Sequence, residues 1–173
     1  MKIGELKGRD FLKLLDFTNE EVQGLVDLAA ELSDVVLMYT ERARRENKTL
    51  LYEEPEGVII VYADRNRLRQ VFINILDNAI KYSDGGDTVA VTLTTISGSA
   101  VISVADTGIG IPEGDQSRVF ERFYRVDKSH SRAIGGTGLG LSIVKHAVAY
   151  HHGTIHLESQ PGEGTVITVT LPK

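Results

Sequence analysis

The sequence predicts an α+β two-layer sandwich, in which helices cover one face of a mixed β-sheet. Helical segments alternate with pairs of strands, in the order helix, strand pair, helix, strand pair, long irregular segment, helix, strand pair. Few strand–helix–strand units of the kind that builds an all-parallel sheet are apparent. A length of 173 residues, with 42% hydrophobic and 25% charged residues, fits one globular domain with a core, or one domain plus an appendage.

The first element that the sequence predicts is a helix over residues 18–48. Thr18 and Glu21 have the spacing of a capping box at its start. Apolar residues then recur at helical spacing along one face: Val22, Leu25, Leu28, Leu32, Val35, Val36 and Tyr39. Two short strands, 49–53 and 58–63, follow on either side of the turn EPEG.

A second helix is predicted from Asp64 to Tyr82, with an apolar stripe formed by Leu68, Val71, Phe72, Ile75, Leu76 and Ala79. Residues 87–96 and 100–106 then predict a β-hairpin around the turn SGS.

The long segment that follows, 107–138, is rich in glycine and charge, and predicts only a short helix near 112–123. Irregular segments of this length are often lids over a ligand, and we expect one over about 113–136. Two further predictions close the chain: a helix over 139–152 that stops at Gly153, and a strand pair, 154–159 and 165–172, around QPGEG.

The composition excludes several classes of protein. A net charge of −5 does not favour a nucleic-acid-binding surface. The absence of cysteine excludes disulfides and thiolate metal sites. No apolar run reaches the roughly 20 residues that span a bilayer, and MKIGELKGRD lacks the apolar centre of a signal peptide.

The helical stretch NILDNAIKY, residues 74–82, contains a candidate site for a metal and phosphate. Asn74 and Asn78 are one turn apart and share a helix face, with Asp77 and Lys81 on or beside it. An amide oxygen suits Mg²⁺, which keeps several waters and also binds substrate phosphates. Lysine can meet phosphate as a point charge. The alternative is an ordinary polar face with chance asparagines.

A second candidate is DTGIGIP, residues 106–112. Asp106 ends an apolar strand, where a carboxylate can accept a hydrogen bond from an exocyclic amine such as that of adenine. Gly108 and Gly110 would let the backbone approach a ligand closely. The alternative is a simple strand-to-loop turn.

A third candidate is GGTGLGLSIVK, residues 135–145, where Gly136, Gly138 and Gly140 precede a helix. A helix start offers unpaired N–H groups and the positive end of the helix dipole, so phosphate is the expected ligand. The spacing is neither that of a Walker A loop nor G-x-G-x-x-G.

Together with FERFYRV, residues 120–126, these motifs resemble the ATP-binding catalytic domain of sensor histidine kinases, a member of the GHKL superfamily with gyrase and MutL. NILDNAIKY is similar to the family's N box, DTGIGI to its G1 box, FERFYRV to its F box and GGTGLGLSIVK to its G2 box. The closing GEGTVITVTLP, 162–172, is also typical. The resemblance covers about 26–173 and implies the Bergerat ATP-binding fold.

The resemblance also implies roles for individual residues. Asn78 is the implied Mg²⁺ ligand, Tyr82 covers the adenine and Asp106 accepts from its amine. The residues implied near the transferred phosphate are Asn74, Lys81, Arg125 and, as a second choice to Arg125, Arg122. The residues implied around the nucleotide are Asn78, Tyr82, Asp106, Gly108, Gly110, Gly136, Thr137, Gly138, Leu139, Gly140 and Thr165.

The implied function is transfer of the γ-phosphoryl group of Mg²⁺-bound ATP to a histidine in two-component signalling. The family's acceptor stretch, similar to S-H-E-[LIF]-[RK]-T-P, is absent, and none of the five histidines precedes the implied ATP domain. We therefore expect a catalytic fragment that does not phosphorylate itself. The alternatives are an anti-sigma-type serine kinase of the same superfamily, and a nucleotide-binding module without turnover.

The implied partners are the helical dimerisation and phosphoacceptor hairpin of a histidine kinase and, indirectly, a response regulator. We expect a monomer without nucleic-acid or membrane contacts, from the cytoplasmic part of a membrane-anchored sensor. Residues 1–25 are predicted to be an N-terminal extension to the catalytic domain, 26–173. Within LKGRDFLKLLDFTNEEVQGLVDLAAEL, residues 6–32, the sequence resembles the N-terminus of ornithine carbamoyltransferases, which raises a fusion or engineered chimera as a further hypothesis.

Overall fold

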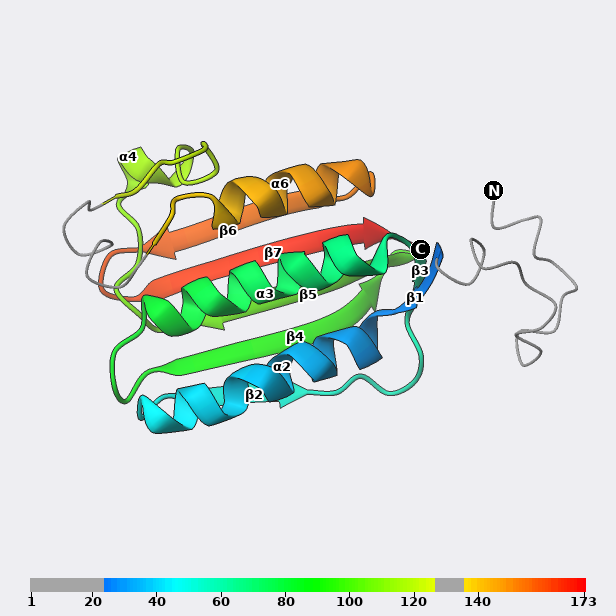
Figure 1. Cartoon of the computed structure of the whole chain (residues 1–173), viewed down its shortest axis with the longest axis horizontal. Helices are drawn as coiled ribbons and strands as arrows, with labels where there is room; N and C mark the ends of the chain where they lie inside the picture. The colour runs from blue at the N-terminus through cyan, green and yellow to red at the C-terminus, as the bar shows by residue number, and fades with distance from the viewer. Residues whose placement is uncertain (1–23, 127–135) are drawn as a thin grey trace, which may run out of the picture.

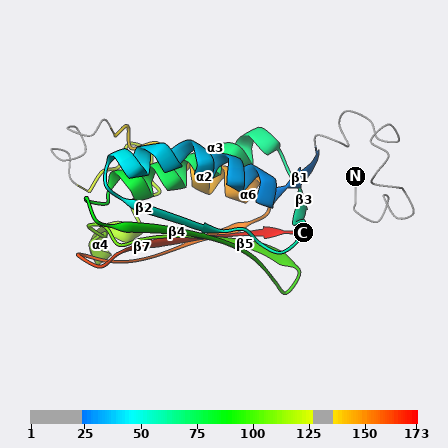
Figure 2. The same ribbon diagram turned by 90° about the horizontal axis from the view of Figure 1, so that it is seen from below.

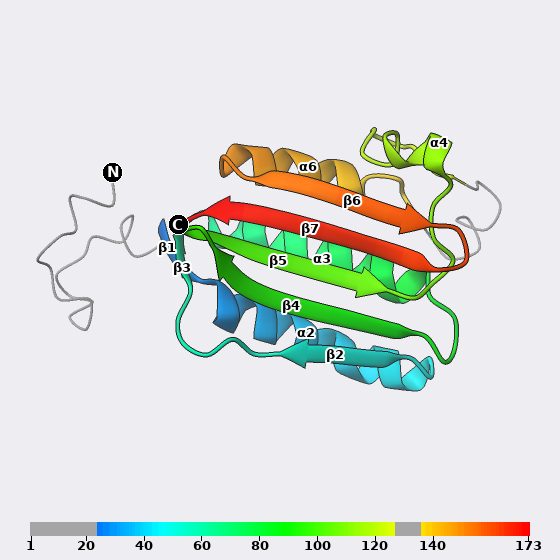
Figure 3. The same cartoon turned by 180° about the vertical axis from the view of Figure 1, so that it is seen from behind.

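A five-stranded mixed sheet forms one layer of the molecule in the computed structural model, which describes residues 24–126 and 136–173. The strand order is β2-β4-β5-β7-β6 (Figures 1 and 3). Only β2 and β4 run parallel among these neighbours; the other pairs are antiparallel. The strands are β2 (Thr49–Glu53), β4 (Thr88–Ile96), β5 (Ser99–Asp106), β6 (Thr154–Gln160) and β7 (Gly164–Pro172).

Three helices form the second layer on one face of this sheet, as Figure 2 shows. They are α2 (Leu28–Arg45), α3 (Arg65–Lys81) and α6 (Gly140–Tyr150). Their apolar stripes and the inward residues of the strands form one core, whose largest buried side chains include Phe72, Leu28, Leu32, Leu68, Leu76, Ile80, Ile102 and Leu171. The predicted α+β sandwich, with helices on one face of a mixed sheet, is confirmed.

The central hairpin follows the prediction closely. β4 and β5 are joined by Ser97 and Gly98, which have φ angles of 49° and 79°. Two positive φ values match the right-handed twist of the strands, which is why short polar residues and glycine occupy such turns. The hairpin brings Asp106, the last residue of β5, to the end of the sheet that lies opposite the Ser97–Gly98 turn.

The first helix begins later than the sequence predicts. Leu25–Asp27 forms a strand, β1, and α2 starts at Leu28. The N-cap is Asp27, whose Oδ1 accepts from the Ala29 N–H at 3.1 Å. The prediction of one helix through these residues is wrong, because Val26 is buried in strand pairing that helical spacing does not reveal. Thr18 lies outside the described residues.

The predicted pairing of residues 49–53 with 58–63 is also wrong. β3 (Ile60–Tyr62) pairs antiparallel with β1, and β2 pairs in parallel with β4. Along the chain, α3 connects β3 of the small sheet to β4 of the main sheet. The small β1–β3 sheet lies at one end of the main sheet, beyond the start of α2 (Figure 1).

A buried charge cluster joins α2 to α3. Glu31 is 1% exposed, and its carboxylate accepts from Arg65 Nε at 2.5 Å and from Arg69 Nη1 at 3.4 Å. A buried carboxylate is tolerated only when it is paired in this way. Glu31 of α2 is therefore linked to α3 through Arg65 and Arg69.

Within residues 107–126, the segment after β5 contains one short helix, α4 (Glu113–Gln116), where the sequence predicts a helix near 112–123. The rest of the predicted lid falls partly on residues 127–135, a stretch that includes His130 and lies outside the described structure. Residues 1–23 also lie outside it. Among the residues that are described, no helix combines the length and the apolar character needed to cross a bilayer.

Candidate nucleotide-binding site

Asp106 lies at the end of β5, opposite Thr165 of β7 in the strand register. Its Oδ1 accepts from the N–H groups of Gly108, at 3.0 Å, and Thr165, at 3.2 Å. Oδ2 has no protein partner among the residues described here. The carboxylate is thus held by two backbone donors, and one oxygen is left to accept from a ligand.

Partial burial changes the acidity of this group. The pKa of Asp106 is raised to about 6, mainly by burial and to a smaller extent by the nearby Asp87 carboxylate, against the lowering effect of the two backbone N–H donors. Asp106 is therefore ionised at neutral pH and lies close to its titration range. Perturbed carboxyl groups of this kind are common at functional sites.

The loop after Asp106 packs directly on the end of α3. A Cβ atom at Gly108 would overlap the carbonyl oxygen of Tyr82, and that oxygen accepts from Ile109 N–H at 3.1 Å. Gly110 has a φ of +68°, and a Cβ there would overlap the Gln160 carbonyl. Glycine is required at both positions by close backbone approach, and the contact brings Tyr82 beside the loop that follows Asp106.

The start of α6 faces the two asparagines of α3. A Cβ atom built on Gly140 would lie 3.7 Å from Asn74 Oδ1 and 3.8 Å from Asn78 Nδ2. Leu139, the N-cap of α6, makes no side-chain capping hydrogen bond. The start of α6, whose first backbone N–H groups have no partner within the helix, therefore lies next to Asn74 and Asn78.

Two buried polar groups in this region have no partner within residues 24–126 and 136–173. They are the Nδ2 of Asn74 and the Nε and Nη2 atoms of Arg125. Asn74 Oδ1, by contrast, accepts from Gln70 Nε2 at 3.2 Å. A guanidinium is a permanent cation, so two buried nitrogens without a partner on the half-buried Arg125 favour an anion as the missing partner.

The segment that carries Arg125 contacts the glycine-rich loop through its backbone. Phe123 N–H donates to the Gly138 carbonyl at 2.8 Å. Gly138 has a φ of +70°, and a Cβ there would lie 2.8 Å from the Phe123 carbonyl carbon. Lys145 of α6 lies 6.0 Å from the centre of the Phe120 ring. The FERFYRV segment and the glycine-rich loop are therefore adjacent in space.

The remaining predicted site residues vary in how well the geometry supports them. Lys81 is half-buried at the end of α3, and Arg122 is exposed beside the Phe123 turn. Gly136 is half-buried, whereas Thr137 is exposed and accepts from Leu139 N–H at 3.4 Å. Asp77 bonds Arg42 of α2 at 2.7 Å, so it is engaged on the α2 side.

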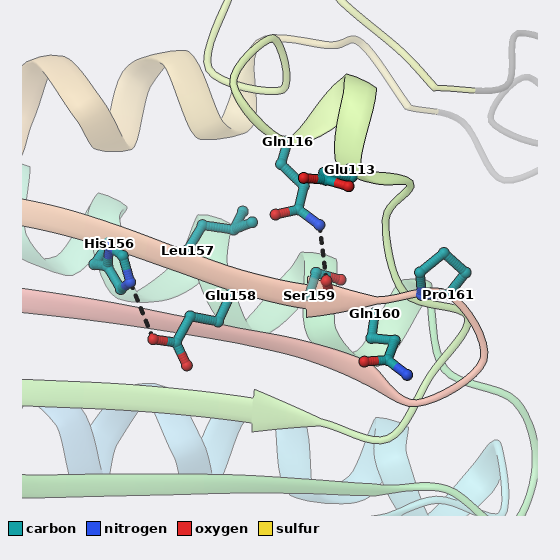
Figure 4. A pocket seen from close by; sticks show the side chains of 8 residues that line it. All are labelled: Glu113, Gln116, His156, Leu157, Glu158, Ser159, Gln160 and Pro161. Atoms are coloured by element: carbon teal, nitrogen blue, oxygen red, sulfur yellow. Dashed lines mark hydrogen bonds and ion pairs between the residues drawn. The ribbon is translucent and has the colours of Figure 1, made fainter.

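Sequence reasoning missed two residues that hold Thr165 and the loop after Asp106 in place. Ser159 of β6 bonds Thr165 at 2.9 Å and Ile111 at 2.8 Å. Gln116 of α4 donates to the Ser159 carbonyl at 2.7 Å (Figure 4). Neither residue lies in a glycine-rich or asparagine-bearing motif, and a local signal for either is lacking.

The layered fold and the paired asparagine and glycine motifs define a class of nucleotide-binding ATPase domain. Residues 63–173 match the model of the histidine kinase-, DNA gyrase B- and HSP90-like ATPase family. The match covers well over half of the chain, so the chain belongs to this family, and the family implies that it binds ATP.

Curated relatives narrow the class to sensor histidine kinases. The chain is 39% identical to the sensor-like histidine kinase SenX3 of Mycolicibacterium smegmatis over 173 residues, which is all of this chain and 43% of SenX3. It is 38% identical to the sensor histidine kinase WalK of Bacillus subtilis over 168 residues, 94% of this chain and 27% of WalK. The chain thus spans less than half the length of either relative.

A solved structure gives the same answer for the fold. The catalytic domain of histidine kinase ThkA superposes with a TM-score of 0.75 and 29% identity, over 86% of this chain and 94% of that domain. Another structure holds ThkA in complex with its response regulator TrrA, at a TM-score of 0.70 and 26% identity, over 86% of this chain and 41% of that chain. The histidine kinase ATPase domain that the four motifs predict is confirmed.

Proposed function

We propose that this domain binds ATP with Mg²⁺ between α3, the start of α6 and the Asp106 loop, and transfers the γ-phosphoryl group to a histidine on a separate acceptor hairpin. The observation that carries the proposal is the half-buried Arg125, whose Nε and Nη2 atoms are buried without a partner among the described residues. Desolvating a permanent cation without an anion is costly, and a terminal phosphate is the anion that this class of domain binds.

The base end of the site supports adenine. The ionised Asp106 carboxylate and the buried Thr165 side chain lie on adjacent strands. A free carboxylate oxygen matches an exocyclic amine, which donates hydrogen bonds. Tyr82 lies beside the same loop and is the residue that we propose to cover the base.

The residues present also fit a magnesium ion. The described residues hold no group of three His, Asp or Glu side chains that could bind a metal alone. Mg²⁺ commonly takes one or two protein oxygens and completes its shell with water and phosphate. The amide oxygen of Asn78 would supply the protein ligand, and bound Mg²⁺ would neutralise charge on the phosphates.

The chain's contribution to the reaction is placement and charge neutralisation. We assign Arg125 to the terminal phosphate, with Arg122 as a second cation, and Lys81 and Asn74 to the same end. The N–H groups of Gly136, Gly138, Leu139 and Gly140 would donate to the phosphates. The acceptor imidazole nitrogen forms the new P–N bond, and the bond from the γ-phosphorus to the bridging oxygen breaks, so ADP leaves with the electron pair.

The partners that we propose for the whole protein are suggested by its relatives. The chain corresponds to 43% of SenX3, so the acceptor hairpin is proposed to lie in another part of a longer kinase or in another chain. The ThkA complex supports a response regulator as the final recipient. We propose a cytoplasmic domain of a membrane-anchored sensor, monomeric when isolated.

The N-terminal segment remains a separate proposal. We place the catalytic domain at 26–173 and treat 1–25 as an extension. The alignment with SenX3 runs through all 173 residues. It therefore supports an extension that belongs to the kinase sequence, rather than a segment fused from a carbamoyltransferase.

The first test is calorimetric titration with ADP and a non-hydrolysable ATP analogue, with and without Mg²⁺. We expect saturable binding that Mg²⁺ strengthens. Asn78→Ala should abolish the Mg²⁺-dependent part, while the control Asn66→Ala, an exposed asparagine in the first turn of the same helix, should keep it. Equal Mg²⁺ dependence in both variants would contradict the assignment of Asn78.

The second test is transfer from labelled ATP to a purified acceptor hairpin of a sensor histidine kinase. We expect acid-labile label on the hairpin, none on the chain alone, and none on a hairpin whose histidine is replaced. Arg125→Ala should slow transfer by about 10²–10³-fold and change ADP affinity little. Acid-stable label on a serine would instead support the anti-sigma-type alternative, and binding without transfer would support a module without turnover.

A further inference from the structure

Ser159 lies where the base end of the proposed site meets the edge of the sheet. It faces Thr165 across the β6–β7 pair, and Thr165 in turn faces Asp106 across the β5–β7 pair. Its side chain and the Gln116 amide are seen together in Figure 4. Ser159 is therefore connected to Asp106 through Thr165 and lies one strand further from the proposed position of the base.

The hydrogen bonds of the Ser159 hydroxyl allow only one arrangement of protons. Its Oγ is 2.8 Å from the Gly164 carbonyl, 2.8 Å from the Ile111 nitrogen and 2.9 Å from Thr165 Oγ1. A carbonyl can only accept and an N–H can only donate, so Ser159 donates to Gly164 and accepts from Ile111. A hydroxyl has one proton and two lone pairs, so the remaining contact must be a hydrogen bond donated by Thr165.

This arrangement fixes the polarity of Thr165. Because its proton is donated to Ser159, its hydroxyl can only accept a hydrogen bond from a ligand that reaches it. The neighbouring Asp106 carboxylate also only accepts. The base end therefore presents two acceptors and suits the exocyclic amine of adenine, whereas the O6 carbonyl of guanine would meet acceptors without a donor.

We propose that Ser159 is a positioning residue that sets the selectivity of the site for adenine over guanine, by holding the Thr165 hydroxyl as an acceptor. The inference rests on the proposed function, since it concerns the same nucleotide site. It adds a residue that contacts no nucleotide and a physical cause for base choice.

Gln116 secures this arrangement from the backbone side. Its Nε2 donates to the carbonyls of Ser159, at 2.7 Å, and Ile111, at 3.0 Å. Two carbonyl acceptors use both amide protons, which also fixes the orientation of the amide. Ser159 is thus held through its main chain by α4 and through its side chain by β7 and Ile111.

The test compares the affinities of ADP and GDP for the wild-type chain and for Ser159→Ala. Removing the serine frees the Thr165 proton, which can then donate to guanine O6. We expect the ratio of GDP to ADP dissociation constants to fall about five- to tenfold, the range of one neutral hydrogen bond. Ser103→Ala, a matched change on β5 whose side chain makes no hydrogen bond within the described residues, should leave the ratio unchanged.

A double-mutant cycle separates positioning from a general structural effect. In a Thr165→Val background, Ser159→Ala should not change the ratio further, because no hydroxyl is left to redirect. Ser159→Thr, which keeps the hydroxyl, should restore the ratio. An equal loss of ADP and GDP affinity in Ser159→Ala, or a ratio identical to wild type, would overturn the inference.

The two proposals fail in different ways. A folded wild-type chain that binds neither nucleotide would overturn the proposed function and this inference with it. A wild-type chain that selects ADP, beside a Ser159→Ala variant that selects it equally well, would overturn the inference alone.

Discussion

At the scale of single residues, Asp106 is held by backbone hydrogen bonds and is also the proposed acceptor for the base. Its Oδ1 is engaged by two backbone donors and its pKa is raised to about 6 by burial. Below pH 6 the carboxyl gains a proton and loses an acceptor. We expect ADP affinity to fall about tenfold between pH 7.5 and pH 5, which follows from one protonation with this pKa. Titration calorimetry at both values measures it.

Asp106→Asn supplies the control for this prediction. The variant should bind ADP more weakly at pH 7.5 and show little change in affinity down to pH 5. Because the folded pKa is raised, the folded state binds more protons than the unfolded state between about pH 4 and 6. The free energy of unfolding of wild type, relative to Asp106→Asn, should therefore fall as pH rises through this window. A relative stability that rises with pH would contradict the assigned shift.

Gly110 provides a second prediction at this scale. Its φ of +68° and its contact with the Gln160 carbonyl leave no room for a side chain. Gly110→Ala should cost at least about 2 kcal/mol of unfolding free energy and lower Tm by about 5 °C or more. Gly114→Ala, in α4 with nothing within 4 Å of an added Cβ, should change Tm little. Thermal unfolding followed by circular dichroism distinguishes them.

How much of the site the sequence predicts depends on the sequence distance of each contact. Asn74 and Asn78 are predictable as site residues because they lie one helical turn apart. Gly140 is predictable because it belongs to the run of glycines at every second position, 136, 138 and 140. Ser159 was missed because its partner Ile111 lies 48 residues away, and the bond exists only once β6, β7 and the loop after β5 have come together. Asp77 is a local neighbour of the asparagines but is paired with Arg42, 35 residues away.

At the scale of elements, β1 shows where periodicity fails. Leu25 and Leu28 fit a helical stripe, yet Leu25–Asp27 pairs with Ile60–Tyr62. Asp27 accepts from Ala29 N–H as an N-cap, and an Asp before an apolar run is a helix-start signal that could have corrected the boundary. The pairing partner of β3 was not predictable in the same way, because the alternation within a strand gives its face and not its neighbour.

The short helix α4 is the element whose position depends most clearly on one side chain. Four residues make a marginal helix, and no side-chain cap is present at its start. Gln116→Ala removes both bonds to β6 and the loop, at Ser159 and Ile111. We expect faster amide exchange over 111–119, while exchange in α3 stays unchanged.

Gln160→Ala is a suitable control for α4, because Gln160 bonds only the exposed Glu163 among the residues described. Hydrogen exchange followed by mass spectrometry compares the variants. Protection over 111–119 that equals that of wild type in Gln116→Ala would show that packing alone holds α4 in place.

At the scale of the whole molecule, the interface between α3 and α6 connects the site to the opposite end of the fold. Gly140 meets Asn74 and Asn78 at one end. At the other end His151 is buried; its Nε2 accepts from Asp64 N–H at 2.9 Å, and its Nδ1 donates to the Ala147 carbonyl at 2.7 Å. The fold class was predictable from the order of the elements alone. The hydrogen bond between His151 and Asp64 was not, because these residues are 87 positions apart in the sequence.

The last prediction concerns the stability of the domain as one unit. The proposed site takes residues from α3, β5, β7 and the start of α6, so a nucleotide that binds only the folded chain must stabilise all of these elements together. At a free ADP concentration about 100 times Kd, the gain is about 2.7 kcal/mol, or about 5–10 °C in Tm for a domain of this size. Calorimetry should show one transition that moves upward without splitting, and Asp106→Asn should shift less at the same ADP concentration. A transition that splits on adding ADP would mean that the site lies within a part of the fold that unfolds separately, and would contradict a site assembled across both layers.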